Sequence, residues 1–151
     1  MKKSEIFFIA LTIIIDQLTK LIVESRMALH DSIEIIKDFF YITYTRNIGA
    51  AWSMFEGMGM VFAILALIVS AGIVYYLIKN QNMSRFERVA LMLICGGAAG
   101  NMIDRIIHGY VVDFLNFYIF GYDYPVFNLA DSFLVIGVIM LIADTFFSKE
   151  K

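Results

Sequence analysis

Four long runs of apolar residues alternate with shorter polar stretches along the chain. They cover about residues 5–23, 58–78, 89–107 and 126–147. A helix needs about 20 mostly apolar residues to cross the hydrocarbon core of a membrane. The pattern therefore predicts four transmembrane helices.

The two long connections, about residues 24–57 and 108–125, contain segments that are typical of β-strands. Residues 38–45 and 110–127 are rich in aromatic and β-branched side chains, and Gly121 and Pro125 indicate a turn within the second segment. Aromatic residues also favour the membrane interface. We expect a small sheet on one end of a helix bundle, within a single domain that spans residues 1–151.

Lysine and arginine residues are unevenly distributed between the two sides of the predicted bundle. Three lie on the side of the two long connections: Arg26, Lys37 and Arg46. Seven lie on the opposite side: Lys2, Lys3, Lys79, Arg85, Arg88, Lys149 and Lys151. Because cytoplasmic loops are enriched in these residues, both termini are predicted to be cytoplasmic. The first run lacks a small-residue cleavage site after it, so we expect it to be a retained helix rather than a signal peptide.

The composition supports a membrane protein. Of the 151 residues, 60% are hydrophobic and 17% are charged, whereas soluble domains average about 25% charged residues. A soluble chain of this length could not hide so many apolar residues from water. The net charge of −2 gives no indication of nucleic acid as a partner.

Several polar residues nevertheless lie inside the predicted spans or directly beside them. Such residues are costly in a membrane and mark either function or a buried pair. At a helical rise of about 1.5 Å per residue, they fall at one depth, in the outer third of the membrane. They are Asp16, Lys20, Asn47, Asn101, Asp104, Arg105, Asp113 and Asp131. This convergence of four segments predicts a site near the extracytoplasmic face.

A pair of aspartates is the chemistry that these residues fit best. Two histidines and the single Cys95 offer neither a zinc-binding spacing nor an activated nucleophile, and we expect no metal or other cofactor. Asp113 and Asp131 flank one predicted hairpin on the extracytoplasmic side, so they can face each other across its base. Two close carboxylates share a proton, and such a pair can activate water to hydrolyse an amide bond.

Two other classes of function remain open at this point. A small proton or ion transporter also carries charges within its spans, but the second run contains no charge. A structural subunit of a membrane complex would explain glycines that pack helices, but it leaves the polar cluster unexplained.

The remaining polar residues are expected to support the site. Asp16 and Lys20 are four residues apart and can form an ion pair, which braces the site and contacts the substrate backbone. Asn101 and Arg105 share a helix face in the same way. Asp104 is expected to pair with a nearby lysine or arginine. Gly96 and Gly100 fit a close contact between helices.

Four motifs resemble those of one known family. They are Asp16-Gln17-x-Thr19-Lys20, TRNIGAAW at residues 45–52, GNMIDR followed by GYVVDF at residues 100–105 and 109–114, and PVFNLADS at residues 125–132. In this order, each at its place relative to a span, they resemble the lipoprotein signal peptidases (signal peptidase II), aspartic peptidases of bacterial membranes. The resemblance covers the whole chain.

The resemblance implies a function, a location and an architecture. It implies a multi-pass enzyme of the bacterial cytoplasmic membrane that removes the signal peptide from prolipoproteins, immediately before a cysteine that carries diacylglycerol. It implies that Asp113 and Asp131 are catalytic and that globomycin-type peptide antibiotics bind. The implied fold has four transmembrane helices, a small β-cradle and a short surface helix. We expect a monomer in contact with membrane lipid, in which six residues brace the site or bind substrate: Asp16, Lys20, Asn47, Asn101, Arg105 and Asn128.

Overall fold

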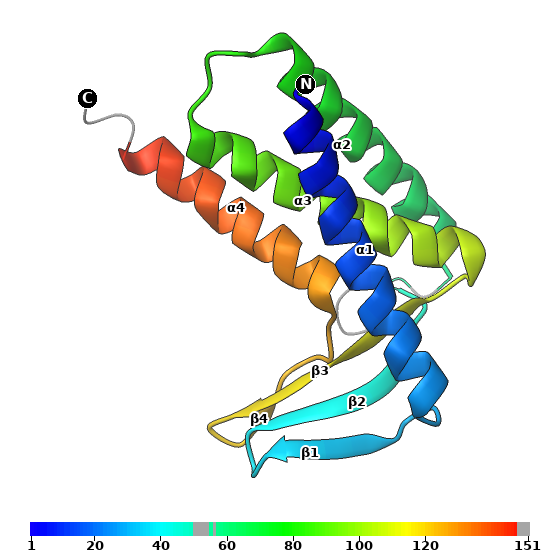
Figure 1. Ribbon diagram of the computed structural model, residues 1–151. Coiled ribbons are helices and arrows are strands. Elements are labelled where there is room, and N and C mark those ends of the chain that lie inside the picture. The colour runs from blue at the N-terminus through cyan, green and yellow to red at the C-terminus, as the bar shows by residue number, and fades with distance from the viewer. Residues whose placement is uncertain (50–54, 56, 148–151) are drawn as a thin grey trace.

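Four helices and a four-stranded sheet form the part of the chain that the computed structural model describes, residues 1–49, 55 and 57–147 (Figure 1). The helices are α1 (Lys3–Arg26), α2 (Gly59–Lys79), α3 (Arg85–Ile107) and α4 (Leu129–Phe147). Each is long and apolar enough to cross a membrane. The prediction of four spans is confirmed.

Two helices, α3 and α4, begin three or more residues away from the start of their apolar runs, each for a local reason. α3 starts at Arg85, because the Ser84 hydroxyl accepts a hydrogen bond from the Glu87 backbone N–H at 2.9 Å and caps a polar first turn. α4 starts only at Leu129, because Phe127 still pairs with Leu115 of the sheet.

Helix α3 lies at the centre of the bundle and contacts the other three helices. Its small residues allow this close packing. A Cβ atom added to Gly100 would lie 2.5 Å from Asp16 Oδ2 on α1, and one added to Gly96 would clash with Thr12 of the same helix. The predicted helix contact at Gly96 and Gly100 is therefore confirmed.

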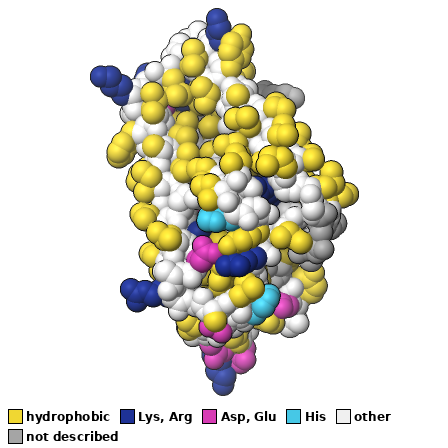
Figure 2. Space-filling view, turned by 90° about the vertical axis from the view of Figure 1, so that its right-hand side faces the viewer, with side chains coloured by type: hydrophobic (Ala, Val, Ile, Leu, Met, Phe, Trp, Pro, Cys, Tyr) yellow, Lys and Arg dark blue, Asp and Glu magenta, His cyan; other side chains and the backbone are white. Residues whose placement is uncertain are grey.

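The outer surface of the bundle is apolar. Figure 2 shows one face of the molecule, on which hydrophobic side chains spread over the helices while basic and acidic side chains gather near the two ends and across the lower part. Large side chains such as Leu21 and Ile68 are about three-fifths exposed, at 61% and 62%. A lipid environment accounts for this exposure, since soluble monomers rarely present so large an apolar surface.

The sheet lies across one end of the bundle and is antiparallel, in the order β1-β2-β3-β4 (Figure 1). Its strands are β1 (Ser32–Ile36), β2 (Phe40–Asn47), β3 (Val111–Ile119) and β4 (Tyr122–Asp123). The predicted sheet is confirmed, and so is the turn at Gly121, which has a φ of 79°. β1 was not predicted from the sequence: polar and apolar residues alternate over only four of its positions, Ser32–Ile35, and all five of its residues are exposed. The short surface helix is not among the elements of the described residues, and the last three residues of the TRNIGAAW motif lie outside them.

A β-bulge in β2 lies beside one of the candidate catalytic residues. Ile42 pairs with Leu115 and Thr45 pairs with Asp113, so β2 has one more residue than β3 between these pairs. Bulges bend a strand locally and often lie next to active sites, where they re-aim a side chain. Behind the bulge, the buried Tyr44 packs against Val23 of α1 and fixes the sheet to the bundle.

The end of the bundle away from the sheet is closed by a buried ion pair. Arg88 of α3 donates from Nη1 to Glu5 Oε1 of α1 at 2.9 Å and from Nη2 to the carbonyl oxygen of Asn80 at 2.8 Å. Both charged side chains are buried or nearly so. This contact joins three parts of the chain far from the sheet.

Candidate active site

Asp113 and Asp131 line one cavity of about 330 Å³ at the sheet end of the bundle. Asp113 comes from β3 and Asp131 from the first turn of α4. Three more polar residues named in the sequence analysis lie on its wall, namely Asn47, Asn101 and Arg105, and the remaining wall is made of Val111, Tyr124, Pro125, Val126 and Phe127. The structure thus brings together polar groups from four elements around a largely apolar space.

Asp113 is 3% exposed and receives a side-chain amide on each oxygen. Asn128 donates from Nδ2 to Asp113 Oδ1 at 2.6 Å, and Asn47 donates from Nδ2 to Oδ2 at 3.0 Å. Burial and then the charge of Asp131 raise the pKa of Asp113 from its ordinary value of 3.8 to about 7. Near neutral pH this carboxyl can therefore hold a proton.

Asp131 is fixed by the start of α4. Its Oδ2 accepts the backbone N–H of Asn128 at 3.2 Å, while Asn128 Oδ1 accepts the backbone N–H of Asp131 at 3.0 Å. This reciprocal pair is a capping box. The other oxygen of Asp131, Oδ1, accepts a hydrogen bond from Asn101 Nδ2 at 2.7 Å. Asp131 therefore both caps α4 and lines the cavity.

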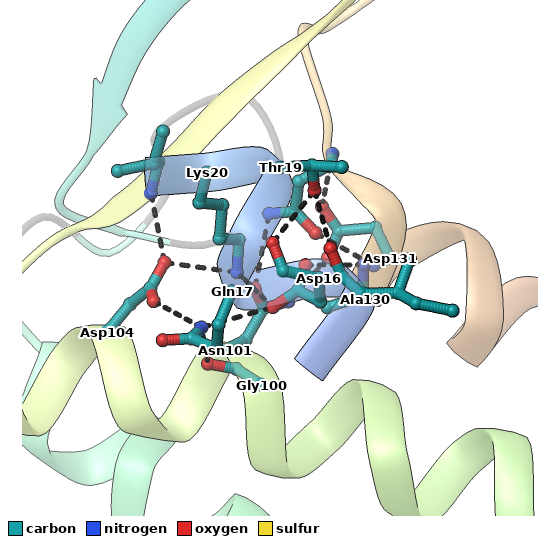
Figure 3. A network of polar contacts seen from close by, with 12 residues as sticks. Asp16, Gln17, Thr19, Lys20, Gly100, Asn101, Asp104, Ala130 and Asp131 are labelled. Carbon is teal, nitrogen blue, oxygen red and sulfur yellow. Dashed lines mark hydrogen bonds and ion pairs between the residues drawn. The ribbon is translucent and has the colours of Figure 1, made fainter. Parts of the chain in front are cut away.

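A buried polar network from α1 lies next to Asp131 (Figure 3). Lys20 Nζ contacts Asp16 Oδ2 at 2.9 Å, Asp104 Oδ2 at 3.0 Å and Asn101 Oδ1 at 2.9 Å. The predicted ion pair of Asp16 with Lys20 is confirmed, and so is the pairing of Asp104 with a basic residue. An ammonium group has three N–H donors, so these contacts use all of them. All three N–H donors of Lys20 are therefore used within the protein.

Asp16 connects this network to α4. It has no exposed surface, and its Oδ1 accepts the backbone N–H of Ala130 at 3.0 Å (Figure 3). This N–H belongs to the first turn of α4, where backbone donors need partners from outside the helix. Asp16 therefore holds the helix that carries Asp131.

Comparison with known proteins gives the family. A family model described as "Signal peptidase (SPase) II" matches residues 8–147. The chain belongs to this family. Lipoprotein signal peptidases of Staphylococcus aureus strains JH9 and Newman are 45% identical to it over 152 residues, which cover 98% of this chain and 93% of each relative.

Two solved structures of bacterial membrane enzymes, both obtained by the in meso method, have the same fold. The one at 2.3 Å resolution has a TM-score of 0.87 at 44% identity and covers 98% of this chain and 93% of its own. The one at 1.9 Å resolution has a TM-score of 0.85 at 44% identity, with coverage of 94% and 92%. This signal peptidase II is accordingly a multi-pass bacterial membrane peptidase.

Arg105 of the peptidase keeps donors available at the cavity. It donates from Nη2 to the carbonyl oxygen of Gly49 at 3.1 Å and from Nη1 to that of Asn101 at 3.3 Å. It forms no ion pair with a carboxylate of the described residues, and a guanidinium has five N–H donors. Arg105 can therefore donate to a carbonyl oxygen of a bound peptide.

Two polar residues of this signal peptidase II, Gln17 and Glu24, join the polar contacts around the site, although neither was predicted from the sequence as a site residue. Gln17 Nε2 donates to Asp104 Oδ1 at 2.8 Å and to the carbonyl oxygen of Gly100 at 3.2 Å. Glu24 Oε1 accepts the hydroxyls of Tyr44 and Tyr110 at 2.8 and 2.9 Å. Glu24 follows Asp16 and Lys20 at intervals of four, so helical spacing was the signal that could have identified it.

Proposed function

We propose that this peptidase removes the signal peptide from prolipoproteins whose cysteine carries diacylglycerol, cutting immediately before that cysteine. The observation that carries the proposal is the shared cavity of Asp113 and Asp131, which sits at one end of four lipid-exposed helices. The lipoprotein signal peptidases that are 45% identical along nearly the whole chain support the same substrate class.

The two carboxyl groups can hydrolyse an amide without a covalent intermediate. One carboxylate takes a proton from water, and the water oxygen attacks the scissile carbonyl carbon. The protonated carboxyl gives its proton to the carbonyl oxygen, which forms a tetrahedral gem-diol. When the C–N bond breaks, the first carboxyl protonates the leaving nitrogen and the second takes a proton from the gem-diol.

The surrounding polar residues have two kinds of role in this proposal. Asn47, Asn101 and Asn128 hold the carboxylates by the hydrogen bonds given above, whereas Asp16 and Lys20 brace them from behind. Arg105 donates to a carbonyl oxygen of the substrate. Such support fixes catalytic groups to within a fraction of an ångström, which the reaction requires.

The position of the site at the end of the bundle suits a lipid-anchored substrate. Acyl chains on the cysteine stay in the bilayer, so the scissile bond lies near the membrane surface. An enzyme whose carboxylates lie at that depth meets the bond by lateral diffusion, already partly oriented. In this proposal the sheet faces the extracytoplasmic side, both termini are cytoplasmic, the protein acts as a monomer, and globomycin-type peptides occupy the same cavity.

Substrate class is tested with the purified protein in detergent micelles. We expect cleavage of a precursor whose cysteine carries diacylglycerol, and at least a hundredfold slower cleavage of the same precursor without the lipid. Globomycin should inhibit the reaction. Equal cleavage of both precursors would contradict the proposed substrate class.

A further inference from the structure

A continuous chain of hydrogen bonds leads from the positive charge of Lys20 to Asp131. Lys20 Nζ donates to Asn101 Oδ1 at 2.9 Å, and Asn101 Nδ2 donates to Asp131 Oδ1 at 2.7 Å. A cation at the oxygen of an amide polarises that amide and strengthens the hydrogen bonds that its nitrogen donates. Asp131 therefore receives a stronger hydrogen bond than a neutral amide alone would give.

The start of α4 favours a negative charge on the same residue. Asp131 Oδ2 accepts the backbone N–H of Asn128 in the capping box. Near a helix N-terminus, unpaired N–H groups and the helix dipole stabilise an anion. Both oxygens of Asp131 thus face donors that favour its ionised form.

The other carboxyl of the pair has weaker partners. Asp113 lies in β3, away from any helix N-terminus, and accepts hydrogen bonds from the amides of Asn47 and Asn128. Lys20 donates to neither amide, because its three donors are used by Asp16, Asp104 and Asn101. The Lys20 charge also lowers the pKa of Asp113, but less than burial and the charge of Asp131 raise it. The two carboxyls are therefore unequal in their surroundings.

Other charges near the pair do not cancel this difference. Among the described residues, the charged side chains that line the cavity or belong to the network behind it are Asp16 and Lys20 on α1, Asp104 and Arg105 on α3, and Asp113 on β3. Asp16 and Asp104 are already paired with Lys20, and Arg105 lines the cavity beside both aspartates.

We propose that Lys20, acting through Asn101, is a positioning residue that keeps Asp131 ionised, so that the shared proton resides on Asp113. Asp131 then takes the proton of the attacking water, and Asp113 donates its own to the scissile carbonyl oxygen. The raised pKa of Asp113 agrees with this order. The inference rests on the proposed function, because it assigns separate tasks to the two members of the proposed catalytic pair.

The pH dependence of kcat/KM tests the assignment. The acidic limb of the bell-shaped profile reports ionisation of the base, and the alkaline limb reports loss of the proton from the acid. Asn101→Ala removes a donor from Asp131 and should move the acidic limb upward by about one pH unit. Asn47→Ala removes a donor from Asp113 and should move the alkaline limb upward instead. The inference would be overturned if Asn101→Ala moved the alkaline limb and Asn47→Ala moved the acidic limb. It would also be overturned if Asn101→Ala left the acidic limb in place.

The role of the Lys20 charge is tested separately. Lys20→Met should move the acidic limb in the same direction as Asn101→Ala, and Lys20→Arg should keep the wild-type limb. If Lys20→Met does not fold, Lys20→Met/Asp104→Asn replaces it, because this pair of changes removes one positive and one negative charge together. An acidic limb that stays at its wild-type position without the positive charge would contradict the role of Lys20.

Gln17→Ala is the matched control, since Gln17 belongs to the same network but its hydrogen bonds go to Asp16, Gly100 and Asp104 rather than to Asp113 or Asp131. It should lower stability and leave both limbs in place; a shifted acidic limb in this variant would contradict the route through Asn101.

Failure of the proposed function can be distinguished from failure of this inference. It would appear as substantial cleavage by Asp113→Asn or Asp131→Asn, whatever the limbs do.

Discussion

Asn128 donates from its side-chain nitrogen to Asp113 Oδ1 at 2.6 Å, and thereby joins the residue before α4 to the middle of the sheet. The same side chain accepts the backbone N–H of Asp131 through its oxygen at 3.0 Å. One amide thus caps a helix and fixes the two aspartates relative to each other. The fold and the site meet at this residue.

Replacing Asn128 can separate its two roles. Serine can still cap α4 but has no amide to donate to Asp113. We expect Asn128→Ser to remain close to wild type in thermal stability while kcat/KM falls about 2- to 10-fold, since a hydrogen bond between neutral groups contributes about 0.5–1.5 kcal/mol. Asn128→Ala should lose about 1 kcal/mol of stability as well. Wild-type cleavage by Asn128→Ser would show that the contact with Asp113 is dispensable.

The approach of α1 to α3 depends on the absence of a side chain at Gly100. An alanine Cβ there would lie 2.5 Å from Asp16 Oδ2, so Gly100→Ala should displace Asp16 and destabilise the protein by about 1–3 kcal/mol. Cleavage should fall with it. Gly72→Ala on α2 is the matched control, because nothing lies within 4 Å of its added Cβ. The control should be as stable as wild type or up to about 1 kcal/mol more stable. Equal melting temperatures for both variants would argue against close packing at Gly100.

The ion pair of Glu5 with Arg88 supports stability away from the catalytic chemistry. Removing one partner of a buried pair leaves the other charge uncompensated, which costs about 3–5 kcal/mol. We expect Glu5→Ala to lower stability by about 3 kcal/mol, while cleavage per folded molecule stays within twofold of wild type. The double variant Glu5→Ala/Arg88→Met should recover part of the loss. The melting temperature in micelles and a cleavage assay below it measure the two effects; a large loss of cleavage in the folded variant would contradict a purely structural role.

The raised pKa of Asp113 predicts how stability depends on pH. Folded protein holds this proton up to about pH 7, whereas an ordinary aspartate releases it near 3.8. Its contribution to stability is therefore present below about pH 4 and is lost as the pH rises to about 7. Between pH 5 and pH 8 this loss amounts to about 2–3 kcal/mol, and Asp113→Asn should not show it. Thermal unfolding of both proteins at the two pH values measures the difference. A gap between them that does not change with pH would contradict the protonated Asp113.

The sequence was sufficient to predict the spans and the meeting of Asp113 and Asp131 at one place, because both depend on patterns that lie close together in the chain. The apolar runs are continuous, and the charges inside them stand out against that background. The contact of Asp16 with the backbone of Ala130 was not predictable, since it joins residues 114 positions apart and involves a donor that every residue has. Strand β1 was missed for a different reason. Its residues alternate between polar and apolar over only four positions, Ser32–Ile35, and its side chains are all exposed, so the signal is too short to distinguish a strand from a loop.

Single replacements of the two aspartates test the central claim most directly. Asp113→Asn and Asp131→Asn keep the size and polarity of each side chain but remove its acid–base chemistry. Each purified variant should melt as a folded protein and should cleave the diacylglyceryl-modified precursor at least a thousandfold more slowly than wild type. Cleavage by either folded variant at a rate near that of wild type would contradict the assignment of Asp113 and Asp131 as the catalytic pair.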